Sequence, residues 1–379
     1  MNHPTDLLPE GLEDRLPASA ARITAAMRAC LETLDAHGYD RVRPPLLEFE
    51  HSLASRMLGA GTQRCFRMTD PASLETLALR SDITPQVGRI AATSMKHAPR
   101  PLRLAYAGDV ALIRASQLDP ARERLQLGAE LIGADTVAAA SEIVTLAVAA
   151  LRAAGLTGIS VDFTLPDLVD TLAGREGSHT PEQLAAIRRE LDTKDAGGLK
   201  AAGGEAYLPL LYAAGPIDEA LPRLRAFDTG AALASRTAGL EAIAEAVGED
   251  ARVTLDPTER HGFEYQSWFG FTLYADGPGR DGAPAGGAQT GALGRGGTYR
   301  IGGSAEAASG FTIYVDALSD LAPQPEPTRT LYLPRGHDPQ AAARLREEGW
   351  RTIAQLSDSE EPQALGCTHV LEEGETRAL

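Results

Sequence analysis

Two short segments carry residue types that could do chemistry. GRGGT at Gly294–Thr298 has enough backbone freedom to cradle a phosphate, and His261 opens the aromatic stretch HGFEYQSWFGFTLYA, where an imidazole could act as a base. Glycine-rich turns between strands are far commoner than phosphate sites, and no helix start follows GRGGT. A single histidine in a strand is more often structural than catalytic. Neither segment defines a reaction by itself.

The common enzyme signatures are missing from this sequence. It contains no P-loop, no dinucleotide-binding G-x-G-x-x-G after a strand, no G-x-S-x-G and no H-E-x-x-H. The three cysteines, Cys30, Cys65 and Cys367, form no C-x-x-C pair, so neither a metal site nor a disulfide framework is indicated. We therefore expect no cofactor, no metal ion and a reducing compartment.

Charge and hydropathy restrict the partners. The 379 residues include 36 Lys and Arg against 52 Asp and Glu, a formal net charge of -16, and no basic block offsets it. Nucleic-acid binding is disfavoured, because it depends on neutralising phosphates. No segment reaches the roughly 18 apolar residues that span a bilayer, and no leader is visible at Met1–Pro9, so we expect a cytoplasmic protein without membrane contact.

Hydrophobic periodicity predicts the elements of the first half. Helices are expected at 18–37, before Gly38, and at 136–154, before Gly155. YDRVRPPLLEFE (39–50) reads as a strand that Pro44 and Pro45 confine to an edge or an interface. Residues 66–86 read as a hairpin around Asp70–Pro71, followed by a strand pair at 102–111 and 124–132.

Composition divides the rest of the chain. Residues 181–247 lack strand signals and are expected to form helices. RVTLDP and HGFEYQSWFGFTLYA are then expected to form one hairpin. The glycine-rich segment 277–297 is expected to be a flexible loop. A strand running into a helix is expected at 310–321, and a proline-rich linker at 322–328. We expect an α+β core at 1–175 and 248–322, a helical insertion at 176–247 and a small α/β appendix at 329–379, with an antiparallel sheet and flanking helices in the core.

Four segments in order resemble the histidyl-tRNA synthetase family. They are LLPEGLEDRLP with GYDRVRPPLLEF, then LALRSDITPQVGRIAA, then QLGAELIGAD, and finally GFEYQSWFGFTLYA with GRGGTYR. The resemblance covers about residues 5 to 320 and is closer to the family's non-catalytic members, the regulatory subunits of ATP phosphoribosyltransferase. It implies a class II synthetase-like core, in which the proline-containing strand pairs two copies.

The resemblance implies a histidine pocket. Asp82, Thr84, Gln126, Glu130 and Tyr265 fall on positions that contact the amino acid's ammonium and imidazole. Carboxylates suit an ammonium, and an imidazole needs a donor, an acceptor and an aromatic wall. Any one of these residues could be an ordinary strand residue with a satisfied side chain. Five matches from three separated segments favour binding.

The same resemblance implies a degenerate ATP site. Leu112 and Ala317 occupy the positions of arginines that hold the nucleotide, although Arg114 lies two positions further on. A third arginine position is His261, next to Arg260. Without these cations the charge that develops on a phosphate is unsupported, so amino-acid activation should fail.

The resemblance thus implies a regulatory subunit. It would serve a short-form ATP phosphoribosyltransferase catalytic subunit, at the first step of histidine biosynthesis, and convey feedback by L-histidine within a hetero-oligomer. One alternative is a truncated synthetase paralogue that still forms an aminoacyl-adenylate. A divergent histidyl-tRNA synthetase is the weaker alternative, because only about 50 residues remain where that enzyme carries an anticodon-binding domain of about 90–100 residues.

Overall fold

The computed structural model describes residues 8–54, 65–113, 121–176, 179–260, 266–278, 284–289, 291–302, 304, 306–318, 321–323 and 329–379. The chain divides into two compact units, Met1–Pro323 and Gln324–Leu379. Each unit has a hydrophobic core of its own.

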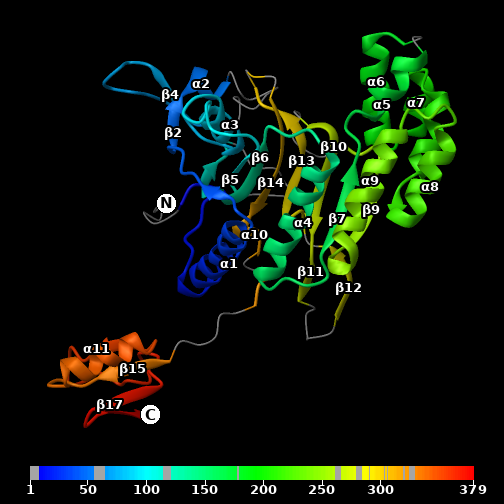
Figure 1. Ribbon diagram of the computed structural model, residues 1–379. Coiled ribbons are helices and arrows are strands. Elements are labelled where there is room, and N and C mark those ends of the chain that lie inside the picture. The colour runs from blue at the N-terminus through cyan, green and yellow to red at the C-terminus, as the bar shows by residue number, and fades with distance from the viewer. Residues whose placement is uncertain are drawn as a thin grey trace, which may run out of the picture. The chain divides into compact units, whose positions relative to one another are not determined.

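A nine-stranded sheet forms the frame of the first unit (Figure 1). Its strands, in spatial order, are β1 (Asp40–Arg41), β5 (Leu102–Ala111), β6 (Glu123–Ile132), β14 (Ala307–Tyr314), β13 (Gly294–Arg300), β10 (Gln266–Tyr274), β7 (Ser160–Thr164), β9 (Arg252–Leu255) and β8 (Gly215–Pro216). The pairs β1–β5 and β7–β9 are parallel and the others antiparallel. The predicted antiparallel α+β core is confirmed.

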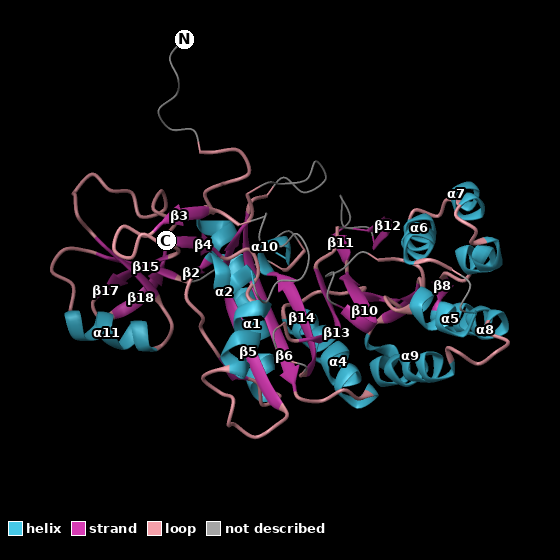
Figure 2. Cartoon of the chain, turned by 90° about the horizontal axis from the view of Figure 1, so that it is seen from above, coloured by secondary structure: helices cyan, strands magenta, loops and turns pink. Residues whose placement is uncertain are grey.

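One face of this sheet is apolar and covered by helices. Figure 2 shows α1 (Pro17–Ala36), α4 (Val137–Ala153) and α9 (Ala234–Val247) along it. Alternate strand residues point into this layer, among them the fully buried Leu127, Phe163 and Ile313. Thr136 caps α4 by accepting from the Ala139 N–H, and Gly38 follows α1 with φ of 79°. Both helices lie where periodicity predicted them.

The second face carries polar side chains and glycines. Residues paired across seven strands form one line, which we call the polar row: Tyr106, Gly128, Thr312, Arg295, Thr272, Asp162 and Thr254. Directly paired strand residues project from the same side of a sheet, so the row occupies one face. Beside it runs a glycine row, in which Glu130 is followed by Gly310, Gly297 and Gly270.

Helix α3 (Thr84–Ala92) packs on part of this second face, and next to this helix, bonded to Gln86 and Arg89 through Glu48, lies a smaller sheet. It contains β2 (Leu47–Phe49), β4 (Thr76–Leu79) and β3 (Arg67–Thr69), in that order, with α2 (Glu50–Ala54) beside it. The predicted hairpin is confirmed for β3 and β4, but its last residues form the start of α3 instead of a strand. The segment 39–50 splits at Pro44 and Pro45 into two strands of different sheets, and β1 lies at an edge as expected.

Residues 168–250 are mostly helical and gather beyond the β7–β9–β8 end of the sheet (Figure 1). They form α5 (Leu168–Glu176), α6 (Pro181–Asp192), α7 (Ala196–Ala201), α8 (Ile217–Phe227) and α9, with the 3₁₀ helices η2 (Glu205–Tyr212) and η3 (Gly248–Asp250). Among the described residues of this range, the two-residue β8 is the one strand. None of the helices in the described ranges combines the length and hydropathy that a membrane crossing requires.

Two further local expectations are wrong. RVTLDP and the aromatic stretch do not form a hairpin, because β7 lies between β9 and β10 and pairs with both. The sequence 277–297 is more than a loop, since β11 (Asp276–Pro278) pairs with β12 (Pro284–Gln289) and β13 begins at Gly294. Backbone pairing needs no side chain, so glycine content did not reveal these strands. The strand expected to run into a helix at 310–321 corresponds to β14, which leads into α10 (Val315–Leu318).

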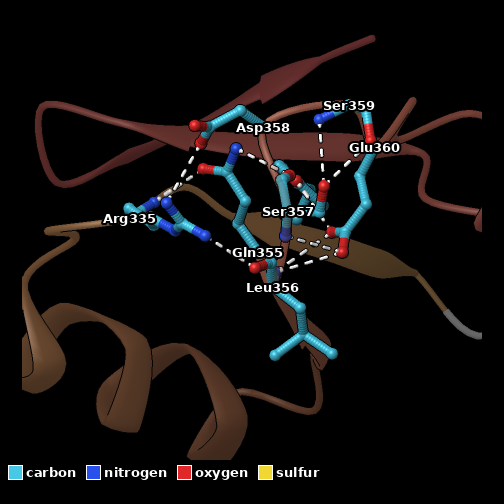
Figure 3. A network of polar contacts seen from close by, with 8 residues as sticks. Arg335, Gln355, Leu356, Ser357, Asp358, Ser359 and Glu360 are labelled. Carbon is cyan, nitrogen blue, oxygen red and sulfur yellow. Dashed lines mark hydrogen bonds and ion pairs between the residues drawn. The ribbon is translucent and has the colours of Figure 1, made fainter.

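The second unit is a small α/β fold. Its sheet has the order β16 (Arg351–Ala354), β15 (Thr330–Leu333), β17 (His369–Glu372) and β18 (Glu375–Ala378), and α11 (Pro339–Glu347) packs on it. Figure 3 shows the loop after β16, where Glu360 accepts from the backbone N–H groups of Leu356 and Ser357. Arg335 pairs with Asp358 at 3.2 Å. The elements expected for this appendix are present.

Candidate functional site

The candidate site lies where α3 begins and crosses β6. Asp82 lies two residues before α3 and Thr84 is the first residue of that helix, while Gln126 and Glu130 project from β6 on the second face of the sheet. All four side chains are buried, with exposed fractions of 9% for Asp82 and 1% for Glu130. Four of the five residues predicted to bind the ligand therefore meet in one place. Tyr265, the fifth, lies outside the described residues, as do His261 and Arg114.

The Gln126 carboxamide organises one end of this site. Its oxygen accepts from the Ile83 N–H at 2.9 Å, and its nitrogen donates to Asp82 Oδ1 at 2.7 Å and to Thr312 Oγ1 at 3.0 Å. Asp82 Oδ1 also accepts from the Thr84 N–H at 3.0 Å. These bonds fix the amide orientation and hold a carboxylate in a buried position, where it suits a cationic ligand group.

Glu130 forms the other end. Thr84 Oγ1 and the Tyr106 hydroxyl donate to Oε1 at 3.0 and 3.2 Å, and the Tyr299 hydroxyl donates to Oε2 at 2.7 Å. Burial, together with the nearby Asp82 carboxylate, raises the pKa of Glu130 to about 8 despite the lowering by the hydroxyl donors. Near neutral pH this carboxyl group can therefore hold or release a proton.

A small pocket opens beside Glu130. Its lining consists of Thr84, Glu130, Gln266, Gly296, Gly297, Tyr299, Gly310, Phe311 and Thr312. Part of the floor is the glycine row, and a Cβ at Gly310 would overlap the Glu130 carboxylate. Glycine is needed there because the acidic side chain lies flat against the strand.

A second network fixes α3 against the smaller sheet. Gln86 Nε2 donates to the Pro45 carbonyl at 2.8 Å and to Glu48 Oε1 at 2.9 Å. Arg89 pairs with Glu48 at 2.6 Å, and Arg80 donates to the Pro44 carbonyl at 3.1 Å. The proline segment and the start of α3 are thus tied together, which positions Asp82 and Thr84.

No cation occupies the two described positions where the resemblance expects phosphate-binding arginines. Leu112 follows β5, and its N–H donates to the Arg122 carbonyl at 2.7 Å. Ala317 lies in α10 and packs against the main core. Arg124 forms an ion pair at 2.8 Å with Asp316, the residue that precedes Ala317.

Three site residues were not assigned from the sequence. Tyr106, Tyr299 and Thr312 each bond to the predicted residues, and all are buried. The tyrosine of GRGGTYR stood in a quoted motif, but only strand register shows that it faces Glu130. Strict alternation along β14 from Gly310 would have placed Thr312 on the same face as that glycine.

The arrangement suits binding. It offers buried acceptors for a cation at Asp82, and a carboxyl group among hydroxyls and a tyrosine ring at Glu130. Among the residues that the structure describes, no three metal-ligating side chains converge. A small cation that carries a polar ring fits this set of groups better than a metal ion does.

Comparisons with known proteins agree on this architecture. A family model described as histidyl-tRNA synthetase matches residues 11–318. Proteins named ATP phosphoribosyltransferase regulatory subunit from Rhodospirillum centenum and Paramagnetospirillum magneticum are 40% and 39% identical, each over 96% of this chain and over 94% and 96% of their own length.

Solved structures extend the likeness. One from Bacillus halodurans, named ATP phosphoribosyltransferase regulatory subunit/histidyl-tRNA synthetase, aligns with a TM-score of 0.78 and 25% identity over 97% of each chain. A histidyl-tRNA synthetase from Nostoc aligns with a TM-score of 0.76 at 14% identity, over 97% of this chain and 91% of its own. The second likeness concerns the fold alone.

Proposed function

This chain belongs to the family of ATP phosphoribosyltransferase regulatory subunits, which share the histidyl-tRNA synthetase fold, and we propose that it binds histidine and conveys feedback inhibition by that amino acid. It acts as a non-catalytic subunit, and its partner is a catalytic ATP phosphoribosyltransferase subunit of the short form.

The observation that carries the histidine assignment is the joined network of Asp82, Thr84, Gln126 and Glu130. The Asp82 and Gln126 end receives the α-ammonium, since it offers a buried carboxylate and an amide oxygen. The Glu130 end receives the imidazole, with the Tyr299 ring beside it. Tyr265, which follows from the resemblance, would complete the ring's surroundings.

The rival reading, a paralogue that still activates amino acids, lacks support at the phosphate positions. Leu112 and Ala317 bring no charge, and Arg124 is engaged by Asp316. Phosphate charge that develops during activation would have few preorganised cations to stabilise it. Histidine-dependent ATP–pyrophosphate exchange by the purified chain should therefore be absent. Turnover near 1 per second would support the rival and contradict our proposal.

We also propose that two copies pair near Pro44 and Pro45. Strand β1 bonds only to β5 among the described residues, so its outer edge offers unpaired backbone groups. A two-fold pairing there would place each copy's Arg80 and Gln86 network close to its partner. Cross-linking at Arg43→Cys should then give a homodimer.

The decisive experiment is co-expression with the short catalytic subunit of the same genome. We expect one hetero-oligomer on size exclusion, with phosphoribosyltransferase activity that histidine inhibits. Glu130→Gln should keep the assembly but alter histidine sensitivity, because the exchanged residue lies in the pocket and is 1% exposed. Separate elution at micromolar concentration, or equal histidine sensitivity without this chain, would contradict the assignment.

A further inference from the structure

Arg295 stands out on the second face of the sheet. It lies on β13, is half-buried, and pairs in register with Thr312 on one side and Thr272 on the other. It is the only positively charged member of the polar row, between the Gln126 end of the pocket and Asp162. A half-buried cation near the start of a strand within the sheet is unusual and calls for a charged neighbour.

The structure supplies no such neighbour within its described ranges. Arg295 makes no hydrogen bond or ion pair there. Nearby carboxylates are otherwise engaged: Asp316 holds Arg124 at 2.8 Å, and Asp162 accepts from Thr254. The charges that act on Asp162 come from Glu259, Arg252 and Asp256. The Arg295 guanidinium is thus available for an anion that the chain itself does not provide.

Tyr314 links Arg295 to the candidate pocket. It pairs with Gln126 in the β6–β14 ladder and is the diagonal neighbour of Arg295, within reach of a long side chain. Burial, with the Asp82 and Asp316 carboxylates, raises the pKa of Tyr314 to about 12, against a lowering by Arg295 and Arg124, so charges of both signs act on the phenol. The hydroxyl stays protonated at neutral pH, and it makes no hydrogen bond within the described ranges.

We propose that Arg295, with the Tyr314 hydroxyl, binds the α-carboxylate of the amino-acid ligand. The inference rests on the proposed function, which places the ammonium at Asp82 and Gln126 and the imidazole at Glu130. Ammonium and carboxylate are attached to the same carbon, so the carboxylate must lie next to Gln126. The neighbouring donors on that side are Tyr314 and Arg295.

A carboxylate fits these donors better than a phosphate does. One guanidinium fork and one hydroxyl match the two oxygens of a carboxylate, whereas a phosphate group attracts several cations. Arg124, whose guanidinium lies over the Tyr314 ring at 5.6 Å, is already paired with Asp316. The site therefore distinguishes an intact amino acid from a ring amine without an acid group.

The test is calorimetry with L-histidine and L-histidinol, which keeps the ammonium and imidazole but lacks the carboxylate. The wild type should prefer histidine by about ten- to a hundred-fold, the usual effect of one charged hydrogen bond. Arg295→Met should lose that preference by weakening histidine alone. Arg300→Met is the matched control, because Arg300 lies on the same strand but is exposed and pairs with Asp135 at 3.5 Å.

Tyr314→Phe provides a second variant that removes a single hydroxyl and keeps the ring. It should reduce the histidine preference by a smaller factor, with thermal melting close to the wild type. Equal weakening of both ligands in Arg295→Met, or no weakening of either, would overturn the carboxylate assignment alone. Failure of the wild type to bind histidine would overturn the proposed function and this inference together. Inorganic phosphate that binds at Arg295 without displacing histidine would assign the cation to another anion.

Discussion

Gly310 lies directly opposite Glu130 in the β6–β14 ladder, and any side chain at position 310 would overlap the Glu130 carboxylate. The acidic group reaches Tyr299 and Thr84 only because the neighbouring strand leaves this space empty.

Gly310→Ala should displace Glu130 and destabilise the protein by about 1–3 kcal/mol, the usual cost of overpacking a core. Urea denaturation gives the free energy of unfolding. Gly291→Ala is the control, because a Cβ there would meet nothing within 4 Å. Equal stability of the two variants would show that the Glu130 side chain can move aside freely.

Glu130 should make the free energy of unfolding depend on pH. Its pKa is about 8 when folded and near 4.5 when exposed, so the native state binds the proton more tightly. The stabilisation of the native state that comes from this tighter proton binding is complete below pH 4.5 and is lost as pH rises to about 8. Glu130→Gln removes this titration, so wild-type stability should fall relative to the variant across that window. Parallel curves for the two proteins would contradict the raised pKa.

Histidine affinity should peak between about pH 6.5 and 8. The ligand's imidazole titrates near 6.5 and free Glu130 at about 8, and the complex has room for one proton between the two groups. Below pH 6.5 both the imidazole and Glu130 are protonated, so binding must release one proton. Above pH 8 both have lost it, so binding must take one up. The affinity therefore falls about tenfold per pH unit on each side. In Glu130→Gln the alkaline limb should shift upward, where ammonium titration alone remains. A flat profile from pH 5 to 9 would place the imidazole elsewhere.

Gln126→Ala should weaken histidine binding by about ten- to a hundred-fold, because the amide holds Asp82 and the Ile83 backbone in place. Isothermal calorimetry is the measurement. Gln340→Ala, at an exposed position of α11 in the second unit, should leave the affinity unchanged. Unaltered affinity in Gln126→Ala would move the binding site away from β6.

The second unit should melt as a separate transition, since it has its own core. Glu360→Ala removes the acceptor for the Leu356 and Ser357 N–H groups and for the Tyr332 hydroxyl. It should therefore reduce the free energy of unfolding of the second unit by about 1–2 kcal/mol. Differential scanning calorimetry separates the two events. A matching shift of the main transition would show that the units unfold together.

Local sequence signals were enough for much of the fold. Periodicity located α1 and α4, and Gly38 and Gly155 marked their ends with positive φ. It failed where pairing is long-range: β7 separates β9 from β10, and no local pattern indicates which strand inserts between two others.

The candidate site was predictable in part for a similar reason. Motifs located Asp82, Thr84, Gln126 and Glu130, but composition could not show that the Tyr106 and Tyr299 hydroxyls both reach Glu130. In the sequence Arg295 is one residue of a glycine-rich run, and only the strand register shows that it lies beside Thr312. Which residues share a face across strands is information that a linear pattern does not contain.

The alternation along β14 gives the two faces of the sheet separate evolutionary constraints. The side chains of Phe311 and Ile313 pack in the apolar core, while Gly310, Thr312 and Tyr314 lie on the opposite face of the same strand, where Gly310 and Thr312 line the pocket. Substitutions at the even positions can alter or abolish a chemical activity while the apolar layer and its stability are preserved. An insertion of one residue would exchange the two sets and ruin both. Single substitutions can therefore convert a catalyst with this fold into a sensor step by step, whereas an insertion or deletion within one of these strands would disrupt the core and the site together.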